Sequence, residues 1–272
     1  MALSSHQKRW VTAFFLAPTL LAFFYLSPPG AFMILACVVS ALALWEYFKN
    51  FCKAGTLLDF GYILAVALGT LILLAAWRGS FRLMFVVLWI TLLVYAGRAM
   101  IRFNQGKRGF EKLTVEALSI LYIPCMLSSL VLLRGEDRGV VWMTLPLWLA
   151  FLSDTGAFYA GTYLGRHKLI PSLSPNKTVE GSAGSILADL AVATVFKLFF
   201  LPELSWVFIL LLAVCAALAT QMGDLFESMI KRSFGVKDMG GIFPGHGGMM
   251  DRIDGMLFTA PVVYCFKVFA AF

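Results

Sequence analysis

Long apolar runs separated by short polar stretches dominate the chain. A helix that crosses a bilayer needs about 20 mainly apolar residues, and nine segments approach that length. They are approximately 10–26, 31–47, 57–77, 81–96, 115–133, 140–164, 182–201, 206–225 and 256–271. The pattern therefore predicts an all-α, polytopic membrane protein with about nine transmembrane helices.

The composition supports this interpretation and excludes other classes. Hydrophobic residues make up 60% of the 272 positions, charged residues only 14%, and the mean hydropathy is +0.84. A soluble domain carries roughly 45–50% apolar and about 25% charged residues, and a disordered chain is more polar still. Five cysteines without a CxxC pair do not form a secreted disulfide framework.

The net charge of +7 is distributed in a way that predicts orientation rather than nucleic-acid binding. With the N-terminus inside, 16 of the 22 Lys and Arg fall on the inner side and four in outer loops. Cytoplasmic loops carry such an excess, so we expect a cytoplasmic N-terminus and an outside C-terminus. Residues 1–139 then form a region of five spans, and residues 140–272 a second region of four.

Two inner loops of the second region, 165–181 and 223–255, concentrate the polar chemistry. Together they hold two of the three His residues and six Asp or Glu. Asp224 begins a stretch with one polar face, which predicts that the eighth helix continues past the membrane boundary. Asp251 and Asp254 follow one turn apart. With Asp224 they make a cluster of hard oxygen ligands suited to Mg²⁺; alternatively, the pair only favours a helix dipole.

Cations and glycines surround these carboxylates in the sequence. Phosphate-binding charge would come from Lys231, Arg232, Lys237 and Arg252, of which the first two are also ordinary topology anchors. The run PGHGG, which contains His246, Gly247 and Gly248, permits close backbone approach and exposes N–H donors. Its alternative interpretation is a flexible loop.

The first loop predicts an anion site at a helix start. Ser174 followed by Pro175 is typical of an N-cap and first helical position. That start places Lys177, Thr178 and Glu180 in the first turns, where backbone N–H groups favour an anion. Within the spans, Asp154 is a functional candidate because a carboxylate in a membrane is costly. Asp189 and Glu116 are weaker candidates of the same kind; alternatively, they pair with a Lys or a hydroxyl, or lie near an interface.

Residues 228–254, SMIKRSFGVKDMGGIFPGHGGMMDRID, closely resemble the signature of phosphatidate cytidylyltransferases, also called CDP-diglyceride synthases. The elements KR, KD, PGHGG and DRID stand unaltered. The upstream stretches DTGAFYAG, GRHKL and SPNKTVEG also resemble the family, except that Val179 replaces a frequent Trp. The resemblance extends from about Leu152 to the C-terminus.

The resemblance implies an integral enzyme of the bacterial inner membrane, with its site on the cytoplasmic side. It implies that CTP and phosphatidate give CDP-diacylglycerol and pyrophosphate with Mg²⁺, in phospholipid biosynthesis. It further implies a homodimer and a two-ion site, holding a divalent ion and K⁺, made by Asp224, Asp251 and Asp254. The implied catalytic residues are these three with Lys231, Lys237, Arg252 and His246; the implied substrate-binding residues are Ser174, Lys177, Thr178, Glu180, Arg232, Gly247, Gly248 and Asp154.

The chemistry of this reaction agrees with the residues. A phosphomonoester has a second pKa near roughly 6, so the attacking phosphate is already dianionic and needs no strong base. Positioning and charge neutralisation then dominate, which makes His246 optional. Two alternatives remain at this point: a CTP-dependent lipid-alcohol kinase, and an ion-coupled transporter that uses Asp154 and Asp189. Against the transporter, no internal repeat is visible.

Overall fold

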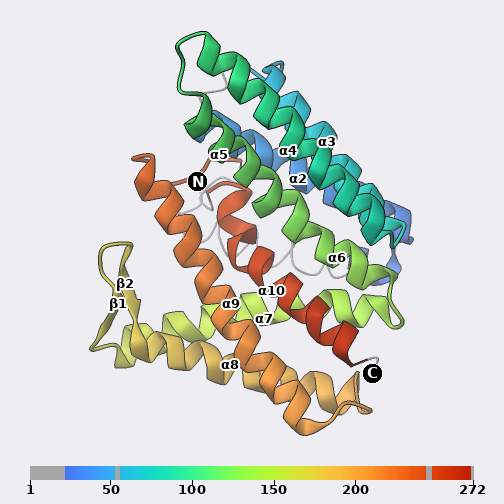
Figure 1. Ribbon diagram of the computed structural model, residues 1–272. Coiled ribbons are helices and arrows are strands. Elements are labelled where there is room, and N and C mark those ends of the chain that lie inside the picture. Colours follow the sequence, from blue (N-terminus) through green and yellow to red (C-terminus); the bar gives the residue numbers. More distant parts are fainter. Residues whose placement is uncertain (1–21, 53–55, 243–246, 271–272) are drawn as a thin grey trace, which may run out of the picture. The chain divides into compact units, whose positions relative to one another are not determined.

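The computed structural model of the protein describes residues 22–52, 56–242 and 247–270. Helices form most of it, with one two-stranded sheet between α7 and α8 (Figure 1). The elements are α2 (Pro29–Phe51), α3 (Phe60–Trp77), α4 (Phe81–Asn104), α5 (Gly109–Ile120), the π-helical turn η1 (Leu121–Cys125), α6 (Met126–Gly135), α7 (Gly139–Leu164), β1 (Lys168–Ile170), β2 (Ser174–Thr178), α8 (Val179–Phe199), α9 (Trp206–Ser233) and α10 (Met250–Phe269).

Seven helices of the described part are long and apolar enough to cross a membrane. They are α2, α3, α4, the continuous stretch from α5 to α6, α7, α8 and α9. The prediction of an all-α polytopic membrane protein is therefore confirmed. Most of the first predicted span lies outside the described residues, and α10, which begins with three charges in five residues, is not among the seven. The count of nine and the positions of the termini stay predictions.

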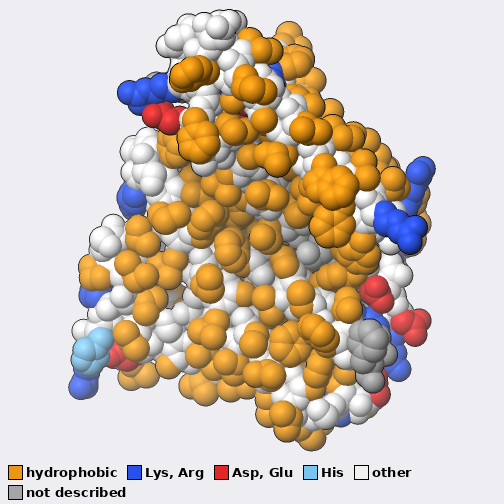
Figure 2. Space-filling model, viewed as in Figure 1, with side chains coloured by type: hydrophobic (Ala, Val, Ile, Leu, Met, Phe, Trp, Pro, Cys, Tyr) orange, Lys and Arg blue, Asp and Glu red, His pale blue; other side chains and the backbone are white. Residues whose placement is uncertain are grey.

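Apolar side chains also cover much of the outer surface, as expected for contact with lipid (Figure 2). On α4, for example, Phe85, Trp89 and Leu93 are all more than half exposed. Such large apolar areas are rare on soluble monomers. The exposed face of α4 is therefore suited to the bilayer interior.

The chain divides into two compact units. The first comprises Met1–Gly135 and Asp238–Arg252, and the second comprises Glu136–Lys237 and Ile253–Phe272. The segment 238–252, which belongs to the predicted C-terminal region 140–272, groups with the N-terminal helices.

In the first unit, local sequence explains where the helices begin and bend. Asp59 caps α3 by accepting the backbone N–H of Gly61 at 2.9 Å, and Ser80 caps α4. Pro124 lies in the π-helical turn η1, between α5 and α6. Proline removes a helical hydrogen bond and crowds the preceding turn, which a local π turn accommodates. Gly69 of α3 lets Pro124 pack closely, since a methyl group there would lie 3.1 Å from the proline ring.

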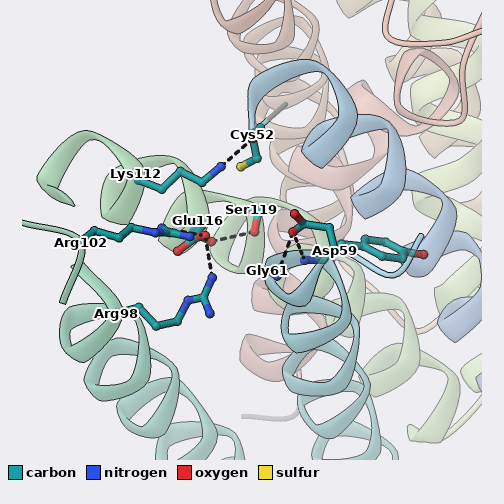
Figure 3. Close-up of polar contacts among 9 residues, drawn as sticks. Cys52, Asp59, Gly61, Arg98, Arg102, Lys112, Glu116 and Ser119 are labelled. Atoms are coloured by element: carbon teal, nitrogen blue, oxygen red, sulfur yellow. Dashed lines mark hydrogen bonds and ion pairs between the residues drawn. The ribbon is translucent and has the colours of Figure 1, made fainter. Parts of the chain in front are cut away.

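Glu116 of α5 is the centre of an ion-pair cluster in the first unit (Figure 3). Its Oε1 accepts from Arg98 at 3.4 Å and from Arg102 at 3.1 Å, both on α4. The carboxylate is buried, and Lys112 nearby donates to the backbone carbonyl of Cys52 at 2.8 Å. Glu116 therefore has the paired role that was its alternative interpretation, but its partners are two arginines instead of a lysine or a hydroxyl.

In the second unit, small residues allow α7 and α8 to pack closely. A methyl group on Gly156 would lie 2.6 Å from the carbonyl oxygen of Gly184, so the two backbones are in contact. Small residues permit this close approach between membrane helices. The eighth predicted helix continues beyond the apolar run 206–225, because α9 extends to Ser233; where it leaves the membrane stays a prediction.

The predicted helix start at Ser174 is wrong. Residues Ser174–Thr178 form β2, which pairs antiparallel with β1 in the register Lys168↔Thr178 and Ile170↔Ser174. The residue before a proline favours extended backbone, and Ser174 follows that preference. The N-cap of α8 is Thr178, whose hydroxyl accepts the N–H of Gly181 at 3.0 Å. Lys177 consequently precedes the helix instead of lying in its first turn.

Candidate active site

An ion pair between Lys177 and Asp224 joins the hairpin to α9 in the second unit. Lys177 is the last residue before the N-cap of α8, and Asp224 lies in α9, near the end of the predicted span 206–225. Both side chains are partly exposed, at 22% and 35%. The pair therefore brings a lysine of the first polar loop to a carboxylate of the second at an accessible position.

Two glycines bring Asp224 close to Asp254 of α10. A methyl group on Gly223 would lie 2.5 Å from the backbone oxygen of Asp254, and one on Gly255 would lie 2.8 Å from the side chain of Thr220. The α9 and α10 backbones therefore touch at the residues beside each carboxylate. The Thr220 and Thr259 hydroxyls, 2.6 Å apart, bridge the same two helices.

The electrostatics at this crossing favour a cation. Burial raises the pKa of Asp254, and the negative charge of Asp224 raises it further. Glu227, one turn after Asp224, lies within hydrogen-bonding reach of Asp254 and pairs with Lys231 at 2.7 Å. Carboxyl groups this close require a proton or a cation between them. Glu227 is not among the site residues predicted from the sequence.

Asp251 belongs to the first unit and there orders the glycine-rich segment. Its Oδ2 accepts the backbone N–H of Gly248 at 2.8 Å and that of Met239 at 3.1 Å. Gly247 has a φ of +83°, which other residues rarely adopt. The Gly248 N–H, predicted as a phosphate donor, thus points to Asp251. His246 lies outside the described residues.

Glu180 has partners that explain it structurally. Its carboxylate accepts the backbone N–H groups of Arg166 and His167 at 3.0 and 3.2 Å and pairs with the ring Nδ1 of His167 at 2.7 Å. These contacts fix the turn that joins α7 to β1. Glu180 thus shapes the loop, and Thr178 caps α8. Substrate binding stays a prediction for both residues.

Three predicted phosphate-binding cations are exposed. Arg232, Lys237 and Arg252 form no ion pair with any other residue that the structure describes. Their charge is therefore available to an external anion.

Asp154 and Asp189 differ in their surroundings. Asp154 is exposed on α7, whereas Asp189 of α8 is buried. Beside them, the hydroxyls of Ser153 and Ser185 lie 2.5 Å apart, and Gln221 donates to Ser185 at 3.1 Å. A polar core therefore links α7, α8 and α9.

Comparison with known proteins identifies the family. The model of the cytidylyltransferase family matches residues 7–270, nearly the whole chain. The protein belongs to the cytidylyltransferase family. This confirms the resemblance inferred from the signature and extends it over the N-terminal helices.

Several curated relatives of this family member are phosphatidate cytidylyltransferases. The Bacillus subtilis enzyme is 38% identical over 57% of this chain and 58% of its own length. That of Staphylococcus epidermidis strain RP62A is 33% identical over 68% of this chain and 67% of its own length. That of Mycobacterium tuberculosis strain H37Rv is 36% identical over 52% of this chain and 42% of its own length. The match thus spans little more than half of the B. subtilis relative.

Proposed function

We propose that the protein is a phosphatidate cytidylyltransferase that makes CDP-diacylglycerol and pyrophosphate from CTP and phosphatidate. Membership of the cytidylyltransferase family and the names of the relatives support this proposal. The observation that carries it is the convergence of Asp224 and Asp254 beside Lys177 and Lys231. Carboxylates that can hold a cation, together with lysines that can hold phosphates, are what transfer of a nucleotidyl group requires.

The proposed reaction balances without a protein nucleophile. An oxygen of the phosphatidate phosphate attacks the α-phosphorus of CTP, and the bond from that phosphorus to the bridging oxygen of the β-phosphate breaks. The electron pair leaves with pyrophosphate. Because a phosphomonoester is largely dianionic at neutral pH, no residue has to remove a proton from it. The protein has to align the two phosphates and neutralise their charge.

The acidic residues fit Mg²⁺. This ion binds through one or two carboxylates and completes its shell with water and substrate phosphates, and Asp224 and Asp254 supply such a pair. No group of three or more His, Cys, Asp or Glu that could hold a metal occurs within the described ranges, so phosphate oxygens would complete the shell. Bound Mg²⁺ would neutralise charge on the reacting phosphates. Asp251, three residues before Asp254, is a further proposed ligand, and K⁺ a proposed second ion.

Lys177 would exchange partners when substrate binds. It now pairs with Asp224; a cation on that carboxylate would weaken the pair and favour contact of the lysine with a phosphate. Arg232, Lys237 and Arg252, exposed as described above, would add charge for CTP or for the lipid headgroup. The proposal also includes a homodimer and a site on the cytoplasmic side of the bacterial inner membrane, where CTP and phosphatidate meet.

The experiment that tests this function measures pyrophosphate release by the purified protein in detergent micelles. We expect release only when CTP, phosphatidate and Mg²⁺ are all present, with one CDP-diacylglycerol formed per pyrophosphate. Release without lipid, or none under any of these conditions, would contradict the proposal.

A further inference from the structure

Glu46, near the end of α2, makes an unusually distant contact. It is 2% exposed, and its Oε2 accepts the backbone N–H of Met250 at 3.0 Å, across 204 residues of sequence. Met250 is the first residue of α10. N–H groups in the first turn of a helix have no partner within the helix, and a negative charge there is favourable. Glu46 therefore caps α10 from another helix.

Two glycines of the signature, Gly240 and Gly248, lie against the carboxylate of Glu46. A methyl group on Gly248 would lie 2.5 Å from both oxygens of Glu46, and one on Gly240 would overlap the same carboxylate. Only glycine permits such close approach at both positions. The glycine-rich sequence around residues 240–248 is thus explained in part by a carboxylate of the N-terminal half of the chain.

Asn50, one turn after Glu46 in α2, contacts Met239, which precedes Gly240. Its Nδ2 donates to the carbonyl of Met239 at 2.6 Å and to the carbonyl of Glu46 at 2.8 Å. The N–H of Met239 donates to Asp251, which also accepts from Gly248. Met239 is therefore held on one side by α2 and on the other by Asp251.

We propose that Glu46 and Asn50 are positioning residues that clamp residues 239–242 and 247–250 and thereby hold Asp251 in place. This inference rests on the proposed function, because Asp251 is a proposed ligand of the metal. It assigns the N-terminal helices a part in the reaction, although they carry none of the site residues predicted from the sequence.

The energetics of Glu46 favour this role over simple packing. Its Oε1 is buried and accepts no hydrogen bond from the residues that the structure describes, and a buried carboxylate without full compensation is costly. An apolar residue would pack at lower cost. Glu116, the other buried carboxylate of this unit, differs because two arginines pair with it. Glu116 thus provides a matched control that does not contact the segment.

The first test measures hydrogen–deuterium exchange of peptides within 239–252 in the full-length protein, without CTP or metal. In Glu46→Ala and Asn50→Ala we expect exchange to accelerate by on the order of tenfold, because each loses a buried hydrogen bond that restrains the segment. Glu46→Gln retains an acceptor oxygen and should fall between Glu46→Ala and the wild type. Glu116→Gln should leave exchange of these peptides unchanged, whatever its effect on the melting temperature.

The second test measures kcat and the Mg²⁺ concentration for half-maximal activity, per folded protein. We expect Glu46→Ala to lower kcat by on the order of tenfold or more, since small displacements of a reacting site are costly. The Mg²⁺ requirement should rise severalfold while the KM for phosphatidate changes little. Glu46→Gln should recover part of the activity, and Glu116→Gln should retain wild-type values.

Two results would overturn the inference. One is wild-type exchange in Glu46→Ala and Asn50→Ala. The other is a loss of activity that matches the loss of folded protein and is equalled by Glu116→Gln. A wild-type protein that makes no CDP-diacylglycerol would refute the proposed function instead, and the exchange experiment would still decide whether the clamp exists.

Discussion

The contact between Gly223 and the backbone of Asp254 allows a prediction whose size follows from distances. In Gly223→Ala the added methyl group would lie 2.5 Å from the backbone oxygen of Asp254, whereas ordinary contacts begin at 3.4 Å. The two helices must therefore separate by on the order of 0.9 Å, the difference between these distances. A shift of that size in a reacting site can cost on the order of 10²-fold in rate.

The assay compares kcat of Gly223→Ala and wild type at saturating CTP and Mg²⁺, with activity expressed per folded protein. We expect a loss of roughly 10- to 100-fold, with a raised Mg²⁺ requirement, because Asp224 and Asp254 move apart. The control is Gly97→Ala in α4, where an added methyl group meets nothing within 4 Å. That variant should match the wild type in rate and be slightly more stable, since alanine favours a helix over glycine.

Retention of more than half of the wild-type rate by folded Gly223→Ala would refute this reasoning. It would mean either that the separation of the two carboxylates does not matter or that the helices do not meet at Gly223. Measuring Gly255→Ala distinguishes these possibilities, because its added methyl group would meet Thr220 rather than the backbone of Asp254. Wild-type rates in both variants would exclude a site that depends on this crossing.

Further predictions concern the ligands, the lysine and the topology. Asp224→Asn and Asp254→Asn should each lower kcat by on the order of 10²-fold or more if metal charge stabilisation is lost. EDTA should abolish wild-type activity until Mg²⁺ is restored. Near-normal rates in both variants would mean that the two carboxylates have only a structural role. Lys177→Ala should lower kcat/KM far more than His246→Ala, and Lys177→Arg should recover part of the loss. A larger loss in His246→Ala, with disappearance of a pH–rate limb near roughly 6.5 in that variant, would indicate that His246 is a general base. A reporter that is active only outside the cytoplasm should be active when fused after Phe272, and silence there would mean that the number of spans is even.

Local patterns in the sequence predicted those parts of the fold that depend on local interactions. The lengths of the apolar runs predicted α3 and α7 to within a few residues. The polar face after Asp224 predicted that the helix continues beyond the apolar run, and α9 does so, ending at Ser233. The helix start at Ser174 was wrong because the backbone there is held by pairing with β1, which N-cap preferences do not include. The π-helical turn at Pro124 likewise depends on the fit of the proline against Gly69 of another helix.

In the candidate site, too, the sequence predicted residue types from local patterns but not the contacts between distant segments. The motif singled out candidate acids and cations, but it did not predict that Lys177 pairs with Asp224 or that Glu227 lies beside Asp254. Glu46 was missed entirely, because a single glutamate near the end of an apolar helix resembles an ordinary interfacial residue. Its role depends on a hydrogen bond across 204 residues. The only trace of it in the sequence is the requirement for glycine at positions 240 and 248.

The central claim, that a nucleotidyl group passes from CTP to the lipid, is tested most directly by the fate of the phosphates. Purified protein would be incubated with phosphatidate, Mg²⁺ and CTP radiolabelled at either the α- or the γ-phosphate. We predict that the α label appears in a lipid with the mobility of CDP-diacylglycerol and that the γ label is recovered only as pyrophosphate. If the γ label appeared in the lipid and the α label did not, this result would contradict the account and indicate a CTP-dependent kinase.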